Sequence, residues 1–182
     1  MNTSADRRVV LLRGINVGKG ARIAMTDLRD CTEAAGCTGV KTVLATGNVV
    51  LTDARPAAEL RAALENAYAT RFGYDALVQI ISRDDVETAA AGYPFDTLDE
   101  HHDYLVFSDD PAVTELVVTT MSEVIEPGGT EAVAAGPGWV YWRVSRGATL
   151  SSAAAKVLNA REHRRHLTTR NLKTVRRILA AG

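Results

Sequence analysis

The sequence predicts an α+β fold of two related subdomains, with mostly antiparallel sheets that carry helices on one face. Short apolar runs of strand length alternate with segments of helical periodicity, in the order β-α-β-β-α-β, over residues 7–82. That order partly recurs after residue 84, as β-α-β-β-α-α. The 182 residues are 46% hydrophobic and 24% charged, which supplies enough apolar material for a buried core.

The first half opens with Val9-Val10-Leu11-Leu12, an apolar run that suits a central strand at residues 8–13. A helix is expected next, because its apolar positions fall on one helical face and Gly36 follows as a stop. Thr46-Gly47-Asn48 predicts a tight hairpin, since a glycine beside an asparagine supplies positive φ. The helices take residues 25–35 and a stretch opened by Pro56, and the other strands take 40–45, 49–52 and 75–82. This is the ferredoxin-like element order.

The second half shows the same kinds of signal. Pro111 opens a helix, the Pro127-Gly128-Gly129 turn follows it, and Gly136-Pro137-Gly138 joins two hairpin strands. Ser151 or Ser152 caps a further helix. The expected strands are 104–108, 131–135 and 139–144, and the expected helices are 84–91, 111–125, 151–159 and 169–180.

No low-complexity linker interrupts the chain. We therefore expect a ferredoxin-like subdomain at residues 1–83 and a related α+β subdomain at residues 84–182, packed as one body. The second subdomain ends in a basic helix.

Charge is unevenly distributed although the formal net charge is only −1. Residues 156–182 hold eight basic residues against one acidic residue, a local charge of +7. The other 155 residues hold 13 basic and 21 acidic groups, a charge of −8. The basic end is expected to pair with the acidic part, within the fold or in a second copy. Contact with an external polyanion is the alternative.

Cysteine usage and the lack of a long apolar stretch indicate a cytoplasmic protein. Cys31 and Cys37 are six residues apart, which is neither a redox nor a zinc spacing, so we expect two buried or half-buried thiols. No run of about 20 apolar residues is present to span a membrane. The polar start of the chain lacks the apolar region of a signal peptide.

The loop from Arg13 to Gly20 is the strongest candidate for ligand binding. It lies between an apolar strand and a helix, where backbone N–H groups can converge on an anion. Its spacing is neither that of a phosphate-binding P-loop nor G-x-G-x-x-G. The predicted contacts are Arg13, Gly14, Asn16, Gly18 and Lys19. The alternative is a turn that needs only flexible φ.

Two further segments carry candidate polar groups. Asn48 lies in the predicted hairpin, which in the expected sheet comes to the same edge as the loop after residue 13. Thr168-Thr169-Arg170-Asn171 is predicted to open the last helix, where Arg170, Lys173 and Arg177 share a face that phosphate or nucleic acid would contact.

No recognisable catalytic motif or metal-ligand spacing is present, and no cofactor is expected. His101 and His102 are adjacent and expected to face solvent, while His163 and His166 lie three apart at a helix end with only Glu162 near them. Ser145 lacks the surroundings of a nucleophile elbow. The aromatic residues at 139–142 are expected to pack in the core, with base stacking and exposure of Trp142 as alternatives.

Several motifs resemble the bacterial domain-of-unknown-function 1697 family. They are Val10-Leu-Leu-Arg-Gly-Ile-Asn-Val-Gly18, Met25-x-x-Leu28, Thr46-Gly-Asn-Val-Val50 and Thr169-Arg-Asn-x-x-Thr-Val175. This chain departs from the family pattern at Lys19-Gly20, at Thr46 in place of serine, and at Leu172-Lys173 in place of a Trp-Asn pair. Its Ser151-Ser152-Ala153 also lacks the lysine usual in that element.

The resemblance implies an α+β fold with two related subdomains, and no established activity. It also implies one polar cluster, made of Arg13, Asn16, Gly18, Asn48, Arg170, Asn171 and Thr174. These residue types without an acid–base pair favour binding over chemistry. We expect a small anionic, phosphate-bearing ligand or nucleotide near residues 13–20. A nucleic-acid binder using the basic C-terminal helix, a self-association module, and an enzyme of unrecognised mechanism remain alternatives.

Overall fold

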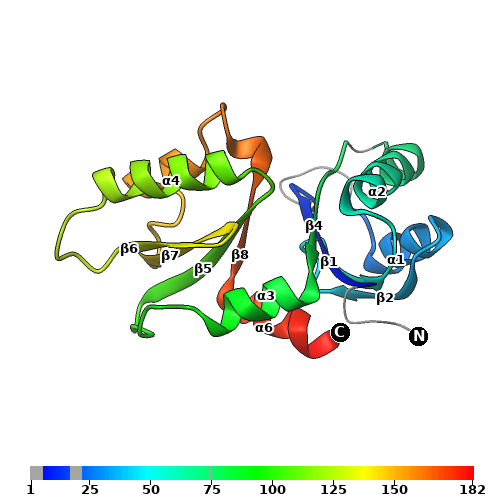
Figure 1. Ribbon diagram of the computed structural model, residues 1–182, viewed down its shortest axis with the longest axis horizontal. Helices are drawn as coiled ribbons and strands as arrows, with labels where there is room; N and C mark the ends of the chain where they lie inside the picture. The colour runs from blue at the N-terminus through cyan, green and yellow to red at the C-terminus, as the bar shows by residue number, and fades with distance from the viewer. Residues whose placement is uncertain (1–5, 17–21, 74) are drawn as a thin grey trace. The chain divides into compact units, whose positions relative to one another are not determined.

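In the computed structural model, residues 6–16, 22–73 and 75–182 are described. The chain forms two compact units, which we call unit 1 and unit 2 (Figure 1). Unit 1 is Met1–Thr88 together with Arg176–Gly182, and unit 2 is Ala89–Val175. Residues 176–182, which the sequence analysis assigns to the second half, thus group with the first.

Unit 1 is built on a four-stranded antiparallel sheet in the order β2-β3-β1-β4. The strands are β1 (Arg7–Arg13), β2 (Thr38–Val43), β3 (Asn48–Thr52) and β4 (Leu77–Ser82). Helices α1 (Met25–Ala34) and α2 (Ala57–Phe72) cover one face (Figure 1). Alternate residues of each strand point to this face, so Val10 and Leu12 join the core beneath the helices while Val9 and Leu11 face the opposite side.

Helix α2 ends where the sequence dictates. Gly73 takes a left-handed φ of 61°, and its N–H donates to the Ala69 carbonyl at 2.9 Å. Leu60, Leu64 and Tyr68 line its fully buried face. The Tyr68 hydroxyl and the Thr32 hydroxyl of α1 share a hydrogen bond of 2.8 Å, which satisfies both polar groups inside the core.

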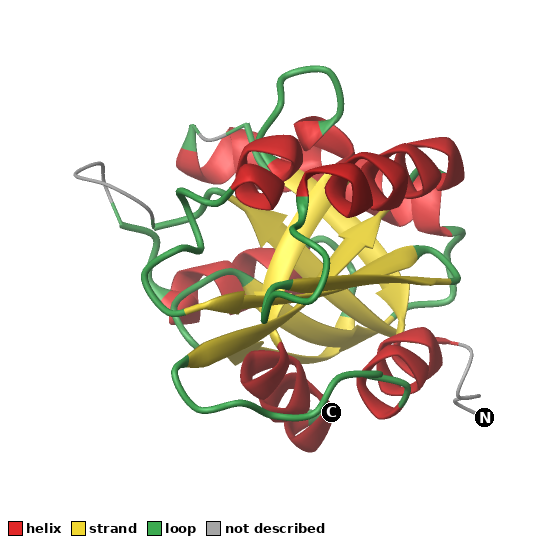
Figure 2. Ribbon diagram, turned by 90° about the vertical axis from the view of Figure 1, so that its left-hand side faces the viewer, coloured by secondary structure: helices red, strands yellow, loops and turns green. Residues whose placement is uncertain are grey.

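Unit 2 repeats the strand order of unit 1, as β6-β7-β5-β8. Its strands are β5 (His101–Ser108), β6 (Ala132–Gly136), β7 (Trp139–Ser145) and β8 (Leu167–Asn171). Helices α4 (Pro111–Val124) and α5 (Ala153–Leu158) share one hydrophobic core with this sheet. Figure 2 distinguishes the helices, in red, from the strands, in yellow. The predicted α+β class with two related subdomains is therefore confirmed.

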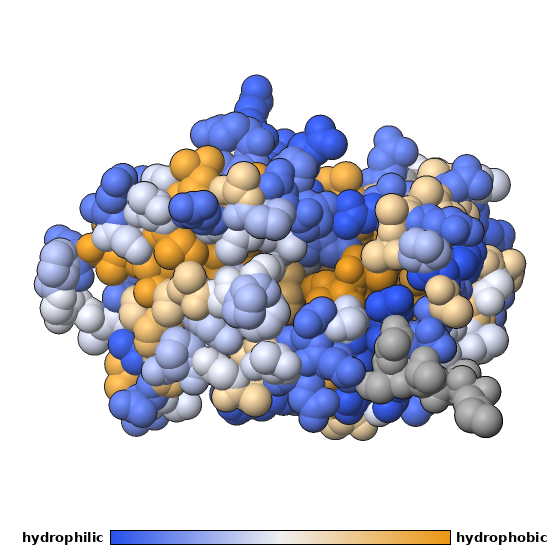
Figure 3. All heavy atoms as spheres, viewed as in Figure 1, coloured by the Kyte–Doolittle hydropathy of each residue, from blue (hydrophilic) through white to orange (hydrophobic). Residues whose placement is uncertain are grey.

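The caps of unit 2 follow the sequence signals. Asp110 accepts hydrogen bonds from the N–H groups of Ala112 and Val113, at the start of α4, with Pro111 in its first turn. Ser152 caps α5 by accepting from the Ala155 N–H at 3.1 Å. The outer side of α4 exposes Leu116 and Val124, and apolar side chains reach the surface there (Figure 3).

The predicted helix at residues 169–180 is wrong in its first turn. Residues 167–171 form strand β8, which pairs with β5, and α6 (Leu172–Ala181) begins only after it. The second half is therefore β-α-β-β-α-β-α, because Leu167 and the threonines after it extend and bury against β5. A 3-10 helix, η2 (Arg164–His166), precedes β8, and helix α3 (Arg83–Ala91) precedes β5.

Among the described residues, no helix combines the length and apolar character that a membrane crossing requires.

Candidate functional site

The loop after β1 and the turn between β2 and β3 are tied together in unit 1. The Leu12 N–H donates to the Gly47 carbonyl at 2.8 Å. The Asn16 side-chain amide donates to the carbonyls of Ala45, at 3.1 Å, and Ile23, at 3.0 Å. Its oxygen accepts from the Ile23 N–H at 2.8 Å. The two segments therefore meet at one end of the sheet, as predicted.

Gly47 makes this close approach sterically feasible. It has a φ of 73°, and a Cβ at this position would overlap Ile15 and lie 2.9 Å from the Leu12 Cβ. Both Ile15 and Leu12 are buried, so neither can move aside cheaply. The turn spans residues 44–47, with Leu44 also at positive φ (57°), and Asn48 is already the first residue of β3 rather than a turn residue.

Asn48 is fully buried and organises the turn. Its amide nitrogen donates to the Val43 carbonyl at 2.8 Å and to the Thr46 hydroxyl oxygen at 2.9 Å. Because the Thr46 oxygen acts as an acceptor here, its own hydrogen points elsewhere. The exposed Thr46 hydroxyl is therefore oriented by a buried neighbour.

Arg13, Asn48 and a residue that sequence reasoning missed, Gln79, project from the same sheet face. Leu11 pairs directly with both Asn48 and Gln79, and Arg13 follows Leu11 by two positions. This face is opposite the one that α1 and α2 cover. Gln79 is 6% exposed, and its signal in the sequence was one amide inside the apolar strand Leu-Val-Gln-Ile-Ile-Ser.

Of the other residues that the sequence predicts to contact a ligand in this loop, the structure describes Gly14 and Arg13. Gly14 is exposed with a φ of 73°, and Asn16 has a φ of 55°, so left-handed residues flank the buried Ile15. Gly18 and Lys19 lie outside the described residues. Arg13 is half-buried at the end of β1, opposite Leu77 of β4.

The candidates from the C-terminal part belong to unit 2. Arg170 lies on β8 opposite Leu105, on the sheet face away from α4, and its guanidinium donates to the Thr168 hydroxyl at 3.0 Å and the Thr169 carbonyl at 2.9 Å. Burial lowers the pKa of Arg170 to about 10. The prediction that Arg170 shares a helix face with Lys173 and Arg177 is wrong, because Arg170 is in a strand and only the other two are in α6.

Asn171 and Thr174 lie beside the junction of β8 and α6. The Asn171 side-chain oxygen accepts from the Lys173 N–H at 2.9 Å, which caps the start of α6. Thr174 is half-buried in the first turn of α6. The expected cluster that joins these residues to Arg13 stays a prediction, since Arg13 belongs to unit 1.

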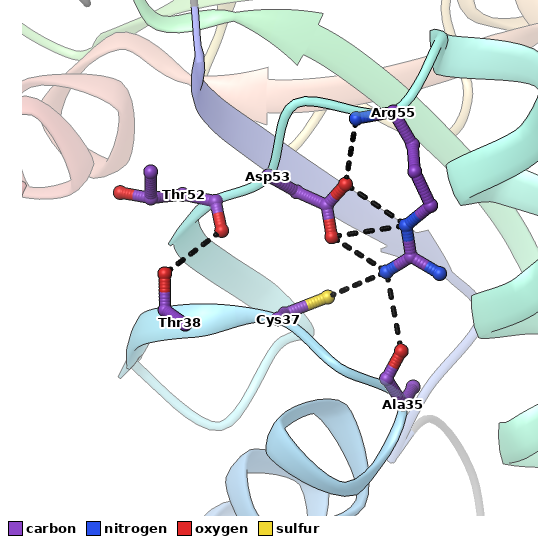
Figure 4. Close-up of polar contacts among 6 residues, drawn as sticks. All are labelled: Ala35, Cys37, Thr38, Thr52, Asp53 and Arg55. Atoms are coloured by element: carbon purple, nitrogen blue, oxygen red, sulfur yellow. Dashed lines mark hydrogen bonds and ion pairs between the residues drawn. The ribbon is translucent and has the colours of Figure 1, made fainter. Parts of the chain in front are cut away.

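A charged cluster that the sequence analysis missed surrounds Cys37 (Figure 4). Arg55 donates to both oxygens of the buried Asp53 carboxylate, with the closest contact at 2.5 Å, and also reaches the Cys37 sulfur and the Ala35 carbonyl. Hydrogen bonds from Arg55 hold the pKa of Asp53 below its ordinary value. Burial, with the neighbouring Asp53, raises the pKa of the Cys37 thiol to about 11.

This Asp53–Arg55–Cys37 cluster is structural rather than reactive. A thiol with a raised pKa stays protonated at neutral pH and is a poor nucleophile. The adjoining surface hollow, of about 350 Å³, is lined by both Asp53 and Arg55. Because the two charges neutralise each other, the hollow offers no net attraction for an anion. Both cysteines are free, with Cys37 buried and Cys31 half-buried, as predicted.

The histidines of unit 2 have specific partners. His101 is half-buried at the start of β5 rather than simply solvent-facing: its Nδ1 lies 2.8 Å from the Asp99 carbonyl and its Nε2 lies 3.1 Å from the Ser145 hydroxyl. His166 Nδ1 contacts the Asp109 carboxylate at 2.8 Å. Within the described chain, no group of three or more His, Cys, Asp or Glu side chains is arranged to hold a metal.

The aromatic residues of β7 pack inside the unit. Trp139, Tyr141 and Trp142 are all at most 6% exposed, and Trp142 stacks on Tyr104 with ring centroids 5.2 Å apart. Its indole N–H donates to the Glu131 carboxylate at 3.0 Å. Core packing is therefore the correct interpretation, and exposure of Trp142 is wrong.

Comparisons with known proteins give a family and a fold. A model of the family described as "protein of unknown function (DUF1697)" matches residues 5–141. A conserved bacterial protein from Streptococcus pneumoniae has a similar structure, with a TM-score of 0.74 and 26% sequence identity. The match covers 96% of this chain and 97% of that chain. No curated protein matches this chain.

Proposed function

We infer that this chain, which belongs to the DUF1697 family of proteins of unknown function, binds a small phosphate-bearing ligand at the end of β1. The binding groups in this proposal are the Arg13 guanidinium, the backbone N–H groups of residues 14–16 and the Thr46 hydroxyl. Asn16 and Asn48 position these groups through their contacts with backbone carbonyls.

The observation that carries the proposal is the junction between the two segments. The Leu12–Gly47 and Asn16–Ala45 hydrogen bonds bring a glycine-bearing loop, a hydroxyl and an arginine to one end of the sheet, although they lie about thirty residues apart in the chain. Gly14 and Asn16 both have left-handed φ values, and left-handed residues in a short loop are typical of the backbone nests whose N–H groups bind anions. A guanidinium matches phosphate geometry in two parallel hydrogen bonds.

Binding rather than catalysis fits the side chains at this end of the sheet. The side chains of Asn16, Thr46, Asn48 and Gln79 are amides and a hydroxyl, which do not exchange a proton by ionising near neutral pH. A general acid–base mechanism needs a group that exchanges a proton near the working pH. The side chains in this proposal can hold and orient an anion, and their rigid contacts keep the ordering cost of binding small.

A thermal-shift screen against nucleotides and phosphorylated metabolites tests the proposal. A ligand present at about 100 times its Kd should stabilise the folded protein by about 2.7 kcal/mol. Arg13→Ala should abolish this shift. Arg29→Ala is the matched control, because it removes the same charge from an exposed position on α1, where Arg29 forms an ion pair with its neighbour Asp30.

The outcome separates site binding from general attraction to anions. Loss of the shift in Arg13→Ala with retention in Arg29→Ala supports the proposal. An equal loss in both variants, or no ligand-induced shift of the unmodified protein across the screen, would count against it.

A further inference from the structure

A second, separate group of cations lies in unit 2, between α5 and β8. Lys156, Arg161, Arg164 and Arg165 are all exposed and fall within ten residues of the chain, with Glu162 as the one acidic residue among them. We call these four cations the basic segment. This stretch is drawn in orange in Figure 1, where its loop projects from unit 2, and Figure 3 shows strongly hydrophilic side chains there.

The four cations are not neutralised by the fold. Within residues 6–16, 22–73 and 75–182, the ion pairs involve other residues, such as Arg55 with Asp53 and Arg146 with Glu100, and none involves the basic segment. Arg170 differs, because it is half-buried and donates to Thr168 and Thr169, while Lys173, Arg176 and Arg177 of α6 form a second exposed set. The structure therefore divides the +7 region into half-buried and exposed members.

The backbone of the basic segment is held rigidly. His163 is 5% exposed, and its Nε2 lies 2.5 Å from the Val157 carbonyl. The Arg164 N–H donates to the Ala160 carbonyl at 3.0 Å, and the His166 N–H donates to the His163 carbonyl at 2.9 Å. His166 then contacts Asp109 at the far end of the segment. A buried histidine thus anchors a turn whose arginines point outward.

The side-chain chemistry selects among anionic partners. Three of the four cations are arginines, whose planar guanidinium groups suit phosphate oxygens. Within residues 156–167 the apolar side chains, such as Val157, Leu158 and Leu167, are half-buried or buried, so this stretch offers none for insertion into a lipid surface; the exposed Leu150 lies outside it. The basic segment also contains no aromatic ring for stacking on unpaired bases.

We propose that the basic segment binds the phosphate backbone of a nucleic-acid duplex without reading its sequence. This surface is independent of the Arg13 site. Contacts to phosphates position a protein on a duplex and carry no sequence information, which matches a patch of cations that lacks groups suited to base edges. The alternative is that the duplex contacts the exposed cations of α6 instead, and the experiment below distinguishes the two surfaces. These cations are Lys173, Arg176 and Arg177.

The test is fluorescence anisotropy with a labelled DNA duplex of about 20 base pairs, titrated with full-length protein at several salt concentrations. Each phosphate contact contributes about −0.9 to the slope of log K against log salt, so four contacts give about −3.6. Affinity should then fall about 150-fold between about 50 and 200 mM salt. The triple variant R161Q/R164Q/R165Q should retain a slope of about −0.9, a fall of about 3.5-fold.

The matched control is K173Q/R176Q/R177Q, which also changes the formal net charge from −1 to −4. All six positions are exposed, so both variants should keep the melting temperature of the original protein. The control should retain the steep slope, and a duplex of unrelated sequence should bind with equal affinity. Three outcomes would overturn the proposal: no binding at the lowest salt, an equal loss of slope in both variants, or strong preference for one duplex sequence.

Discussion

Replacing Gly47 by alanine tests the junction on which the candidate site depends. The position has a φ of 73°, which costs an L-residue roughly 1–2 kcal/mol. The new Cβ would also overlap Ile15 and lie 2.9 Å from the Leu12 Cβ and 3.2 Å from the Leu12 carbonyl oxygen. Overpacking of this kind costs about 1–3 kcal/mol. The free energy of unfolding should therefore fall by roughly 2–5 kcal/mol.

Gly73→Ala is the control, because the difference between the two variants isolates the steric cost of the new Cβ at position 47. Gly73 also has a left-handed φ, of 61°, but a Cβ there would meet nothing within 4 Å. This variant should lose only the backbone cost of roughly 1–2 kcal/mol. The smaller unfolded-state entropy of alanine affects both variants alike and cancels in the comparison.

Urea unfolding followed by far-UV circular dichroism is the appropriate assay. Both tryptophans, Trp139 and Trp142, lie in unit 2, so their fluorescence reports that unit and not the site of the change. If Gly47→Ala costs no more than Gly73→Ala, the turn and the loop after β1 are not in contact, and the argument for a site there fails.

Two further predictions concern the Asp53–Arg55–Cys37 cluster. Because Arg55 lowers the pKa of Asp53, the ionised carboxylate stabilises the fold above its unfolded pKa of about 3.9, and this stabilisation is lost as pH falls through the lower folded pKa. Asp53→Asn should thus lower the free energy of unfolding by about 1.5–3 kcal/mol at neutral pH. The difference in free energy of unfolding between the variant and the original protein should become smaller in acid. A difference that stays constant from neutral pH down to acid would contradict this prediction. In native protein treated with iodoacetamide at mildly alkaline pH, the half-buried Cys31 should be alkylated before Cys37, because burial and a raised pKa should protect Cys37 until urea is added. Mass spectrometry of the digested protein measures the order in which the two thiols are alkylated. Early alkylation of Cys37 would show that the cluster is open to the reagent.

The fold class could be read from local patterns because each pattern has a local physical cause. Helical periodicity in residues 25–34 and 57–72 and apolar runs in β1 and β4 follow from burying one face of each element. The exception was β8, where Thr168-Thr169 resembles a helix cap in sequence. Pairing with β5 overrides that local preference, and pairing is not visible within a window of a few residues.

Local sequence patterns alone determined the α+β class, the partial recurrence of one element order along the chain and the glycine-bearing loop after β1. Only the tertiary structure decided which polar residues act together. Strand register places Gln79 on the same sheet face as Arg13 and Asn48, and Asp53 and Arg55 enclose Cys37. In the basic C-terminal part, Arg170 is half-buried, while the basic segment and the cations of α6 are exposed. The physical reason is that side-chain direction and burial depend on partners far away in the chain, which no single stretch of sequence contains.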